Sequence, residues 1–411
     1  MKRDPTCLLV GGGNLVEVRK AIALRGCRIV MINFQEAIDR MAPSDEIVHA
    51  EGVDFTHPLG VVRRLLELNK VWNFRAVVPI SEYGIQPCAL VASQLGLPTL
   101  ALKAVQNTRD KLRMRRTLEQ AGLGQLRYAS CTTFEQAEAF FKFGGGAPII
   151  VKPNGGTGSD GVSKVTSSEK VAEAFGLATS ARAYHGGVLC EEFIEGPEVS
   201  VEGFSLHGGF VPVAITDKIT DARFLEIGHN QPSAHPAELQ QRAFAFTAQA
   251  LAALGVTHGV SHTELKLTPG GPVMIETHTR NGGDSIHLLT ERTTGVDLAD
   301  VVVGISFGEE PQVRPRRTGL AAAIRFLPGG RQGRVRAIEM PATKSCALIE
   351  SASVYLQVGD LAIGRSSSLD RLGEVIAVGP TPEAVGLAAD SFLANMKVSL
   401  QEDSPWTAQA V

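Results

Sequence analysis

The chain has 411 residues, more than one average domain, so two or three domains are expected. Hydrophobic residues make up 44% and charged residues 20% of the chain, which is typical of a globular enzyme-sized protein. Lys and Arg number 40 against 43 Asp and Glu, and the net charge of −3 argues against a nucleic-acid-binding protein.

The cysteines and apolar segments predict a cytoplasmic location. The six cysteines are scattered without a C-x-x-C pair, which in a chain of this length indicates reduced thiols rather than a disulfide framework. The apolar run near the N-terminus is too short for a signal peptide. No apolar stretch reaches the roughly 18 residues of a membrane span. We therefore expect neither a membrane nor a nucleic acid as a partner.

Residues 1–105 alternate short β-branched runs with helical patterns. Such runs are typical of buried parallel strands, and the segments between them have the apolar spacing of helices. The predicted strands are 7–10, 28–33 and 75–80, and the predicted helices are 14–26 and 83–98. An open parallel α/β domain is therefore expected over residues 1–105.

A glycine-rich turn, Gly11–Gly12–Gly13, follows the first predicted strand. Val16 stands where the dinucleotide fingerprint G-x-G-x-x-G has its last glycine, and Glu36 is the only acid in "INFQE" that could bind a ribose. A tight turn that helps to place a ligand is favoured over NAD binding.

The composition changes near residue 106. The region 106–309 has a basic helix, a glycine-rich loop between two strand-like runs, a strand–linker–strand segment, a long helix and a hairpin. The region 310–411 is rich in strands and closes with one amphipathic helix over 381–400 and a loose tail over 401–411. The predicted helices of the middle region are 108–122 and 236–255, and its strand–linker–strand segment is 187–206.

Residues 262–280 alternate polar and apolar side chains on both sides of "TPGGP", the pattern of a β-hairpin. If the turn centres on Gly270, Glu264 lies opposite Glu276; a slip of one residue remains open, but parity puts both carboxylates on one face. The positions predicted to face the core are Leu265, Leu267, Val273 and Ile275, with the apolar Met274 as the exception.

Opposed carboxylates destabilise a strand pair, so a compensating group is expected. Three interpretations are open on the hairpin alone. Mg²⁺ would bind both carboxylates and leave positions for phosphates. A solvated face would be neutralised by Lys266 and Arg280. Zinc would use the neighbouring histidines, His262 and His278, together with the acids.

The segment "VKPNGGTGSDGV" could bind the phosphates that accompany Mg²⁺. Lys152 ends a strand-like run, and glycines at 155, 156, 158 and 161 leave backbone N–H groups free to approach phosphate oxygens. The loop is not a Walker A loop, because no G-K-[ST] closes it. Lys111 on the basic helix is a second phosphate candidate, Glu191 begins a linker that could flank an adenine, and Glu198 could accept ribose hydroxyls.

Four segments in chain order resemble the successive nucleotide and metal motifs of the ATP-grasp enzymes. They are "RDKLRMRRTLEQAGL", "IIVKPNGGTGSDGV", "CEEFIEGPEVSVEGF" and "HTELKL…VMIETHTRNGGD". The match spans about 106 to 305, and the flanking regions fit the family's three-part architecture: an N-terminal open parallel α/β domain, a central pair of ATP-grasp subdomains and a C-terminal strand-rich domain. The resemblance implies ATP as co-substrate and Mg²⁺, with Mn²⁺ as an alternative.

The resemblance also implies roles for individual residues. Lys111 and Lys152 would hold ATP phosphates, and Glu264 and Glu276 would bind the metal. Arg280 would face the reacting groups and, with Lys152, be catalytic. The remaining nucleotide contacts would be the loop residues Gly155, Gly156, Gly158, Ser159 and Gly161, with Glu191 and Ile194 at the adenine and Glu198 at the ribose.

Within the superfamily, "IETHTRNGGDSI" is most similar to the bacterial L-amino-acid ligases, which form dipeptides. Many relatives carry E-x-N-x-R where this chain has His278, so His278 could bind metal, contact substrate or pack. Glu226 and His229 occupy the place of a Glu-x-x-His that contacts the first amino acid, and a polar loop is the other interpretation. Glu82, at the end of a strand, is a further candidate for the substrate pocket. His262 is expected to be structural.

The implied reaction is ATP-dependent formation of an amide from a carboxylate and an amine through an acyl phosphate, with ADP and phosphate released. No enzyme nucleophile is needed, and a homodimer is compatible with the resemblance. The rival hypotheses are another ATP-grasp ligase, of the purine-pathway or carboxylase type, and a non-catalytic ATP-binding regulator.

Overall fold

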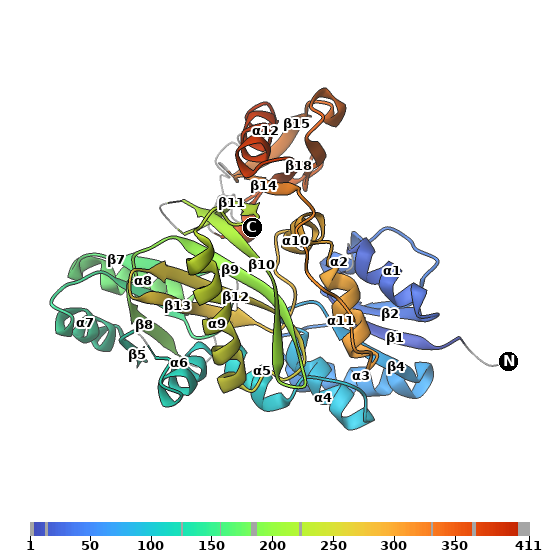
Figure 1. The fold of residues 1–411 in the computed structure, drawn as a ribbon, viewed down its shortest axis with the longest axis horizontal. Coiled ribbons are helices and arrows are strands. Elements are labelled where there is room, and N and C mark those ends of the chain that lie inside the picture. The colour runs from blue at the N-terminus through green and yellow to red at the C-terminus, as the bar shows by residue number, and fades with distance from the viewer. Residues whose placement is uncertain are drawn as a thin grey trace, which may run out of the picture. The chain divides into compact units, whose positions relative to one another are not determined.

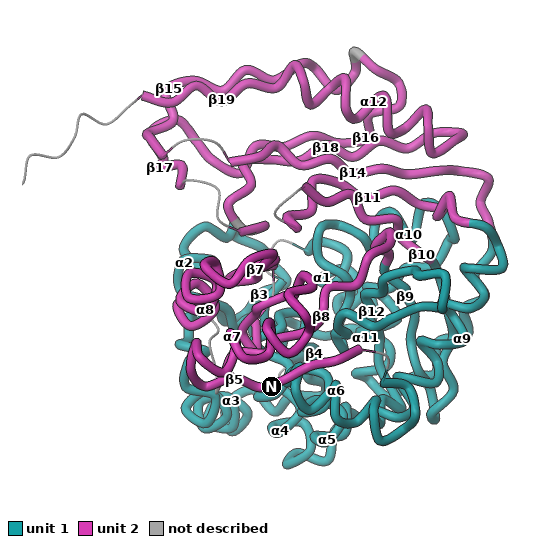
Figure 2. The backbone as a smooth tube through the Cα atoms, turned by 90° about the vertical axis from the view of Figure 1, so that its left-hand side faces the viewer, with its two compact units in different colours: residues 1–125, 200–214, 236–316 teal, residues 126–199, 215–235, 317–411 magenta. Residues whose placement is uncertain are grey.

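The computed structural model describes residues 4–12, 15–124, 126–156, 158–181, 187–221, 224–329, 332–363 and 367–401 (Figure 1). Gly13 of the glycine turn and the tail 402–411 lie outside them. The chain forms two compact units (Figure 2). Unit 1 comprises residues 1–125, 200–214 and 236–316; unit 2 comprises 126–199, 215–235 and 317–411. The three-part division at 105 and 309 stays a prediction.

Unit 1 begins with the expected parallel α/β sheet, in the strand order β3-β2-β1-β4. Strand β3 was not predicted, because its residues "IVHAEG" are all half-buried and carry His and Glu instead of a continuous apolar run. The strands are β1 (Thr6–Val10), β2 (Arg28–Asn33), β3 (Ile47–Gly52) and β4 (Phe74–Pro79); the helices are α1 (Val16–Leu24), α2 (Gln35–Asp39), α3 (Pro58–Trp72) and α4 (Ile85–Leu95).

The glycine turn after β1 is tight, as its sequence predicts. Gly11 and Gly12 have φ of +81° and +64°, a backbone conformation that favours glycine. A Cβ on Gly11 would lie 2.3 Å from the Cβ of Ser81, at the end of β4. The missing side chain therefore lets the turn approach the residue that precedes Glu82.

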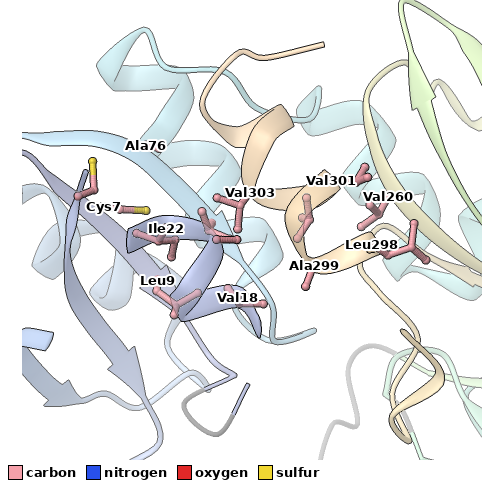
Figure 3. Close-up of a cluster of buried hydrophobic side chains, with 14 of the residues drawn as sticks. Cys7, Leu9, Val18, Ile22, Ala76, Val260, Leu298, Ala299, Val301 and Val303 are labelled. Atoms are coloured by element: carbon pink, nitrogen blue, oxygen red, sulfur yellow. The ribbon is translucent and has the colours of Figure 1, made fainter. Parts of the chain in front are cut away.

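The rest of unit 1 packs on this sheet through α11. Figure 3 shows its side chains Leu298, Ala299, Val301 and Val303 between residues of α1 and β1 on one side and Val260 on the other. In unit 1 the strand order is β13-β12-β9-β10. The strands are β9 (Glu198–Leu206, whose first two residues belong to unit 2), β10 (Gly209–Thr220), β12 (Gly259–Thr268) and β13 (Gly271–His278). The helices are α5 (Leu102–Arg109), α6 (Lys111–Gln120), α9 (Ala237–Leu254), α10 (Ile286–Thr294) and α11 (Leu298–Ser306).

The prediction of a single basic helix over 108–122 is wrong in one respect: the helix is interrupted at Asp110, which separates α5 from α6. Asp110 is extended (φ −100°, ψ 105°), ends α5 and caps α6 by accepting a hydrogen bond from the backbone N–H of Arg113. Lys111 consequently becomes the first residue of α6.

Unit 2 has a sheet in the order β5-β8-β6-β7, covered by two helices around a core that includes Val151 and Val188. The end of β10, from Ile215, continues in this unit with the order β10-β11-β14-β18-β16, and a further sheet has the order β17-β15-β19. The strands of the first sheet are β5 (Tyr128–Cys131), β6 (Ile149–Pro153), β7 (Ser163–Val165) and β8 (Val188–Glu192), and its helices are α7 (Phe134–Phe143) and α8 (Val171–Thr179). The later strands are β11 (Glu226–Gln231), β14 (Ala321–Leu327), β15 (Gly333–Glu339), β16 (Ile349–Val354), β17 (Leu361–Ala362), β18 (Gly373–Gly379) and β19 (Lys397–Gln401).

The helix predicted over 381–400 is too long. Helix α12 (Pro382–Ala394) ends at Asn395, and residues 397–401 form β19 against β15. In "KVSLQ" the apolar Val398 and Leu400 alternate with polar residues, which is a strand period. In the described part of the chain, no helix is long and apolar enough to cross a membrane.

Candidate active site

The hairpin β12–β13 pairs Glu264 with Glu276, as predicted, but through a β-bulge. Beyond Glu264 the register shifts so that Leu265 faces Met274, which leaves Ile275 as an extra residue. A bulge re-aims the side chains beside it and is common next to active sites. The bulge therefore helps to set the direction of Glu276.

The turn explains why the bulge is needed. Thr268 pairs with Gly271, so the turn centres between Pro269 and Gly270 rather than on Gly270 as predicted. Without the bulge, this half-residue difference would place Ile275 instead of Glu276 opposite Glu264. The core face is altered accordingly: Met274 is buried and Ile275 only half-buried, so the prediction for these two residues is wrong.

Glu264, Glu276 and His278 offer ligand atoms that all lie within 4.8 Å of one another. The two carboxylate side chains are only 12% and 15% exposed. This burial contradicts the solvated-face interpretation of the hairpin. Two carboxylates and an imidazole are a donor set that fits a divalent cation, and the carboxylates are the hard oxygen ligands that Mg²⁺ takes.

A row of three interacting side chains, Glu202–His262–Glu264, fixes the position of Glu264. His262 Nδ1 lies 2.9 Å from Glu202 Oε2, and its Nε2 lies 3.1 Å from Glu264 Oε1. Ser200 Oγ donates to Glu202 at 2.6 Å. Burial lowers the pKa of His262, but the carboxylates of Glu202 and Glu264 outweigh this effect and raise it to about 9. The structural role expected for His262 is thus the orientation of Glu264.

A second row of the same kind, Glu82–His278–Glu276, fixes the position of Glu276. His278 Nδ1 lies 2.9 Å from Glu82 Oε2, and its Nε2 lies 3.2 Å from Glu276 Oε1. The rings of His262 and His278 stack across the hairpin with centroids 6.1 Å apart. Burial raises the pKa of Glu82, but the cationic groups of His278, Arg280 and Arg109 outweigh it and lower the pKa well below its usual range.

Two basic side chains of helix α6 contact the bulge in β13. Lys111 Nζ lies 2.7 Å from Glu276 Oε2. One turn later the buried Arg115 donates to the carbonyl oxygens of Met274 and Ile275, both at 2.8 Å. Lys111 and Arg115 therefore fix both the carboxylate and the bulged backbone that carries it. Arg115 was not singled out in the sequence, although its spacing of four residues from Lys111 puts both on one helix face.

Arg280 lies two residues after His278, the last residue of the group Glu264, Glu276 and His278. Its Nε donates to Glu82 Oε2 at 3.0 Å and its Nη1 to the carbonyl of Asn281 at 2.8 Å. The side chain remains 12% exposed. Glu82, placed in the substrate pocket by the sequence analysis, thus orients His278 and Arg280 in this structure, and a direct substrate contact by Glu82 stays a prediction.

In unit 2, Lys152 at the end of β6 pairs with Glu191 of β8, Nζ to Oε2 2.7 Å, and both side chains are 5% exposed. The loop that follows has a left-handed backbone at Gly156, Gly158, Ser159 and Gly161. Turn conformations of this kind expose backbone N–H groups, as an anion-binding loop requires. Thr157 lies outside the described residues.

The loop is held by hydrogen bonds to distant parts of unit 2. Ser159 Oγ donates to the carbonyl of Phe224 at 3.2 Å, and the backbone N–H of Ser368 donates to the carbonyl of Gly158. Ile194 is half-buried just after β8. The nucleotide contacts expected from Gly155, the loop, Glu191 and Ile194 stay predictions.

A buried lysine links two of the predicted acids. Lys218 Nζ lies 3.1 Å from Glu198 and 3.3 Å from Glu226, and its side chain is 2% exposed. The sequence analysis missed Lys218. Its position in β10, shortly after the apolar residues 213–215, could have indicated a buried lysine, and a buried lysine is normally paired with an acid. The predicted ribose acid and the predicted substrate acid therefore share one cation.

Glu226 and His229 lie in a polar cluster on β11. Ser368 Oγ donates to Glu226, and Arg371 lies 3.2 Å from it while stacking 3.7 Å from the ring centroid of Phe326. His229 is fully buried and packs edge-on against the same ring. The register shifts between Gly228 and Glu226, leaving Ile227 as an extra residue that alters the alternation of side chains. Substrate contacts by Glu226 and His229 stay predictions.

Comparison with protein-family models matches residues 146–287 to the ATP-grasp domain and residues 325–401 to the L-amino acid ligase C-terminal domain 2. The alanine–anticapsin ligase of Bacillus subtilis (strain 168) is 26% identical over 273 residues, which are 61% of this chain. The match spans 58% of that relative's length.

Among the solved structures with a similar fold, two are informative. The L-amino acid ligase from Bacillus licheniformis aligns with a TM-score of 0.83 at 20% identity, over 98% of this chain and 100% of that one. The biotin carboxylase domain of the Hydrogenobacter thermophilus 2-oxoglutarate carboxylase, solved with MgADP and bicarbonate, aligns with a TM-score of 0.75 at 18% identity, over 97% and 91%. The chain therefore has the ATP-grasp fold, with residues 146–287 matching the ATP-grasp domain and residues 325–401 matching the C-terminal domain 2 of L-amino acid ligases.

Proposed function

We propose that the protein is an ATP-dependent carboxylate–amine ligase that joins two L-amino acids, or an amino-acid-like acid and an amino acid. The observation that carries the proposal is the group of a buried His278 and the half-buried Glu264 and Glu276, with Arg280 two residues after His278. Lys111, His262 and His278 compensate the two carboxylates in this structure, and the ligand atoms of the group lie close enough together to bind one divalent cation. In a chain with ATP-grasp and L-amino acid ligase domains, Mg²⁺ bound to ATP is the cation that the group fits.

The first step is attack by a substrate carboxylate on the γ-phosphorus of ATP. A carboxyl-oxygen–phosphorus bond forms, the bond from the γ-phosphorus to the β,γ-bridging oxygen breaks, and ADP leaves. Mg²⁺ held by Glu264 and Glu276 would neutralise the phosphate charge during this step. Lys111, Lys152 and the loop 155–161 would bind the phosphates, so catalysis consists of positioning and charge neutralisation.

The second step is attack by the amine of the other amino acid on the acyl carbon. Phosphate leaves with the electrons of the carbon–oxygen bond and takes up the proton that the attacking nitrogen loses, and an amide remains. Arg280 would stabilise the oxyanion of the tetrahedral species, since Glu82 and the Asn281 carbonyl already fix its guanidinium. The glycine-rich loop would exclude water from the acyl phosphate.

A product screen tests the proposal. Proteinogenic amino acids are supplied in pairs with ATP and Mg²⁺, phosphate release is measured, and the products are identified by mass spectrometry. Dipeptide formed in proportion to phosphate is the expected result, and Glu276→Gln is the control that should abolish both signals. ADP formed only with bicarbonate, formate or a nucleotide precursor would support a carboxylase-type or purine-pathway-type ligase. ATP binding without turnover on any acid would support a regulator.

A further inference from the structure

His278 has an unassigned part in the cation site. We propose that His278 Nε2 is a third protein ligand of the cation that Glu264 and Glu276 bind, and that Glu82 orients the imidazole for this purpose. The inference rests on the proposed function, because it concerns the same ATP-dependent site. It adds a nitrogen donor to a site whose other protein ligands are carboxylate oxygens.

The geometry of the donor group supports the assignment. Glu276 and His278 are two residues apart on β13, so their side chains leave the strand on the same face. Their ligand atoms and that of Glu264 lie within 4.8 Å of one another. Ligands on opposite sides of a Mg²⁺ ion are about 4 Å apart, because each bond is about 2.1 Å long. Small side-chain rotations would therefore bring all three atoms around one ion.

The partner of the other ring nitrogen supplies the second argument. A metal-binding histidine almost always gives its second N–H to a carboxylate or carbonyl, which fixes the tautomer and the ring orientation. His278 Nδ1 lies 2.9 Å from Glu82 Oε2. Arg280 and Arg109 hold the same carboxylate, at 3.0 and 3.4 Å. Nδ1 thus carries the donated proton, and Nε2 is the nitrogen that faces Glu276.

His262 shows why the group contains one histidine and not two. Its ring is also bonded on both sides, to Glu202 and Glu264, yet it is not a member of the three-atom group. Glu202 and Glu264 bind its two nitrogens as Glu82 and Glu276 bind those of His278, but the His262 ring lies outside the group of ligand atoms that are within 4.8 Å of one another. The two stacked histidines therefore differ in role, which makes His262 a matched control for His278.

A nitrogen ligand has a consequence for metal choice. Mg²⁺ prefers oxygen ligands throughout, whereas transition ions such as Mn²⁺ bind imidazole more readily. The site should therefore favour Mn²⁺ over Mg²⁺ more strongly than the same site with an oxygen donor. His278→Asn supplies that oxygen donor in a side chain of similar shape.

Pulsed electron paramagnetic resonance of Mn²⁺ bound to the full chain with a non-hydrolysable ATP analogue tests the ligand directly. We expect a nitrogen coupling that changes from ¹⁴N to ¹⁵N when the protein carries ¹⁵N-labelled histidine. The coupling should vanish in His278→Asn and persist in His262→Asn. If His278→Asn fails to fold, His278→Gln takes its place, and the persistence of the coupling in His262→Asn assigns it to His278. A wild-type spectrum without histidine nitrogen coupling, or one unchanged in His278→Asn, overturns the assignment.

Binding measurements give a second readout. Titration of Mn²⁺ and Mg²⁺ in the presence of the analogue should show that His278→Asn lowers the preference for Mn²⁺ about tenfold. Glu82→Gln should weaken Mn²⁺ binding about tenfold while the nitrogen coupling remains, as expected for a partner of the ligand. An unchanged metal preference in His278→Asn contradicts the proposal.

The outcome can be separated from that of the proposed function. Dipeptide formation without histidine coupling overturns the ligand assignment and leaves the ligase function in place. Histidine coupling in a protein that forms no dipeptide supports the assignment and overturns the proposed joining of two amino acids.

Discussion

Replacing Arg115 with Met should destabilise unit 1 and disturb the cation site. The substitution keeps most of the apolar stem and removes two hydrogen bonds of 2.8 Å from a buried guanidinium to the carbonyls of Met274 and Ile275. Hydrogen bonds to charged groups contribute about 1.5–3 kcal/mol each. The expected loss in the free energy of unfolding is therefore about 3–6 kcal/mol, and Mn²⁺ binding should weaken about tenfold because Glu276 loses its fixed backbone.

Urea unfolding followed by circular dichroism measures the first effect. Hydrogen exchange of a peptide covering β13 locates it, and a Mn²⁺ titration measures the second. Arg116→Met is the matched control, because Arg116 is the exposed neighbour on the same helix and its loss should change stability by no more than about 0.5 kcal/mol. If Arg115→Met unfolds at the same urea concentration as Arg116→Met and binds Mn²⁺ normally, the role given to the bulge contacts is wrong.

Three further outcomes are expected. Arg280→Ala should lower the rate of amide formation by about 10²-fold or more, measured by mass spectrometry of products; a rate near that of the wild type would contradict its oxyanion role. Gly11→Ala should cost about 2 kcal/mol or more in urea unfolding, because φ is +81° and the new Cβ meets Ser81, whereas Gly26→Ala, with φ +68° and open space, should cost about half as much. Burial lowers the pKa of His262, but the carboxylates of Glu202 and Glu264 outweigh burial and raise it to about 9. Protonated His262 therefore stabilises the metal-free fold fully below pH about 6.5, and this contribution is lost as the pH rises through about 9. His262→Gln should therefore have a flatter stability curve between these pH values in urea unfolding, and an equal slope would show that His262 is not the titrating group.

Local sequence patterns determined several elements correctly. The β-branched run 28–33 coincides with β2, and the long helix predicted over 236–255 is α9, Ala237–Leu254. The period of two on either side of "TPGGP" was enough to pair Glu264 with Glu276. These features depend on neighbours within one element, and such information is present in the order of the residues.

The misjudged elements show the limit of that information. The half-buried strand β3 lacks an apolar run, Asp110 divides what reads as one helix, and the strand β19 follows α12 with a break at Asn395. The bulge at Ile275 reflects a balance between turn position and strand pairing, so periodicity alone could not predict it.

The sequence alone, through residue type, spacing and the resemblance to ATP-grasp enzymes, predicts the carboxylates, the lysines, the glycine-rich loop and Arg280 as the chemistry-bearing groups, and their roles stay predictions. Only the tertiary structure decided how these groups are held. Glu82 and His278 meet across 196 residues of chain, Glu202 and His262 across 60, and Arg115 and Met274 across 159. Contacts over such separations exist only after the chain has folded, and no local pattern specifies which buried acid will lie beside which histidine or arginine. The positioning of the candidate cation site is therefore a property of the fold rather than of any single motif.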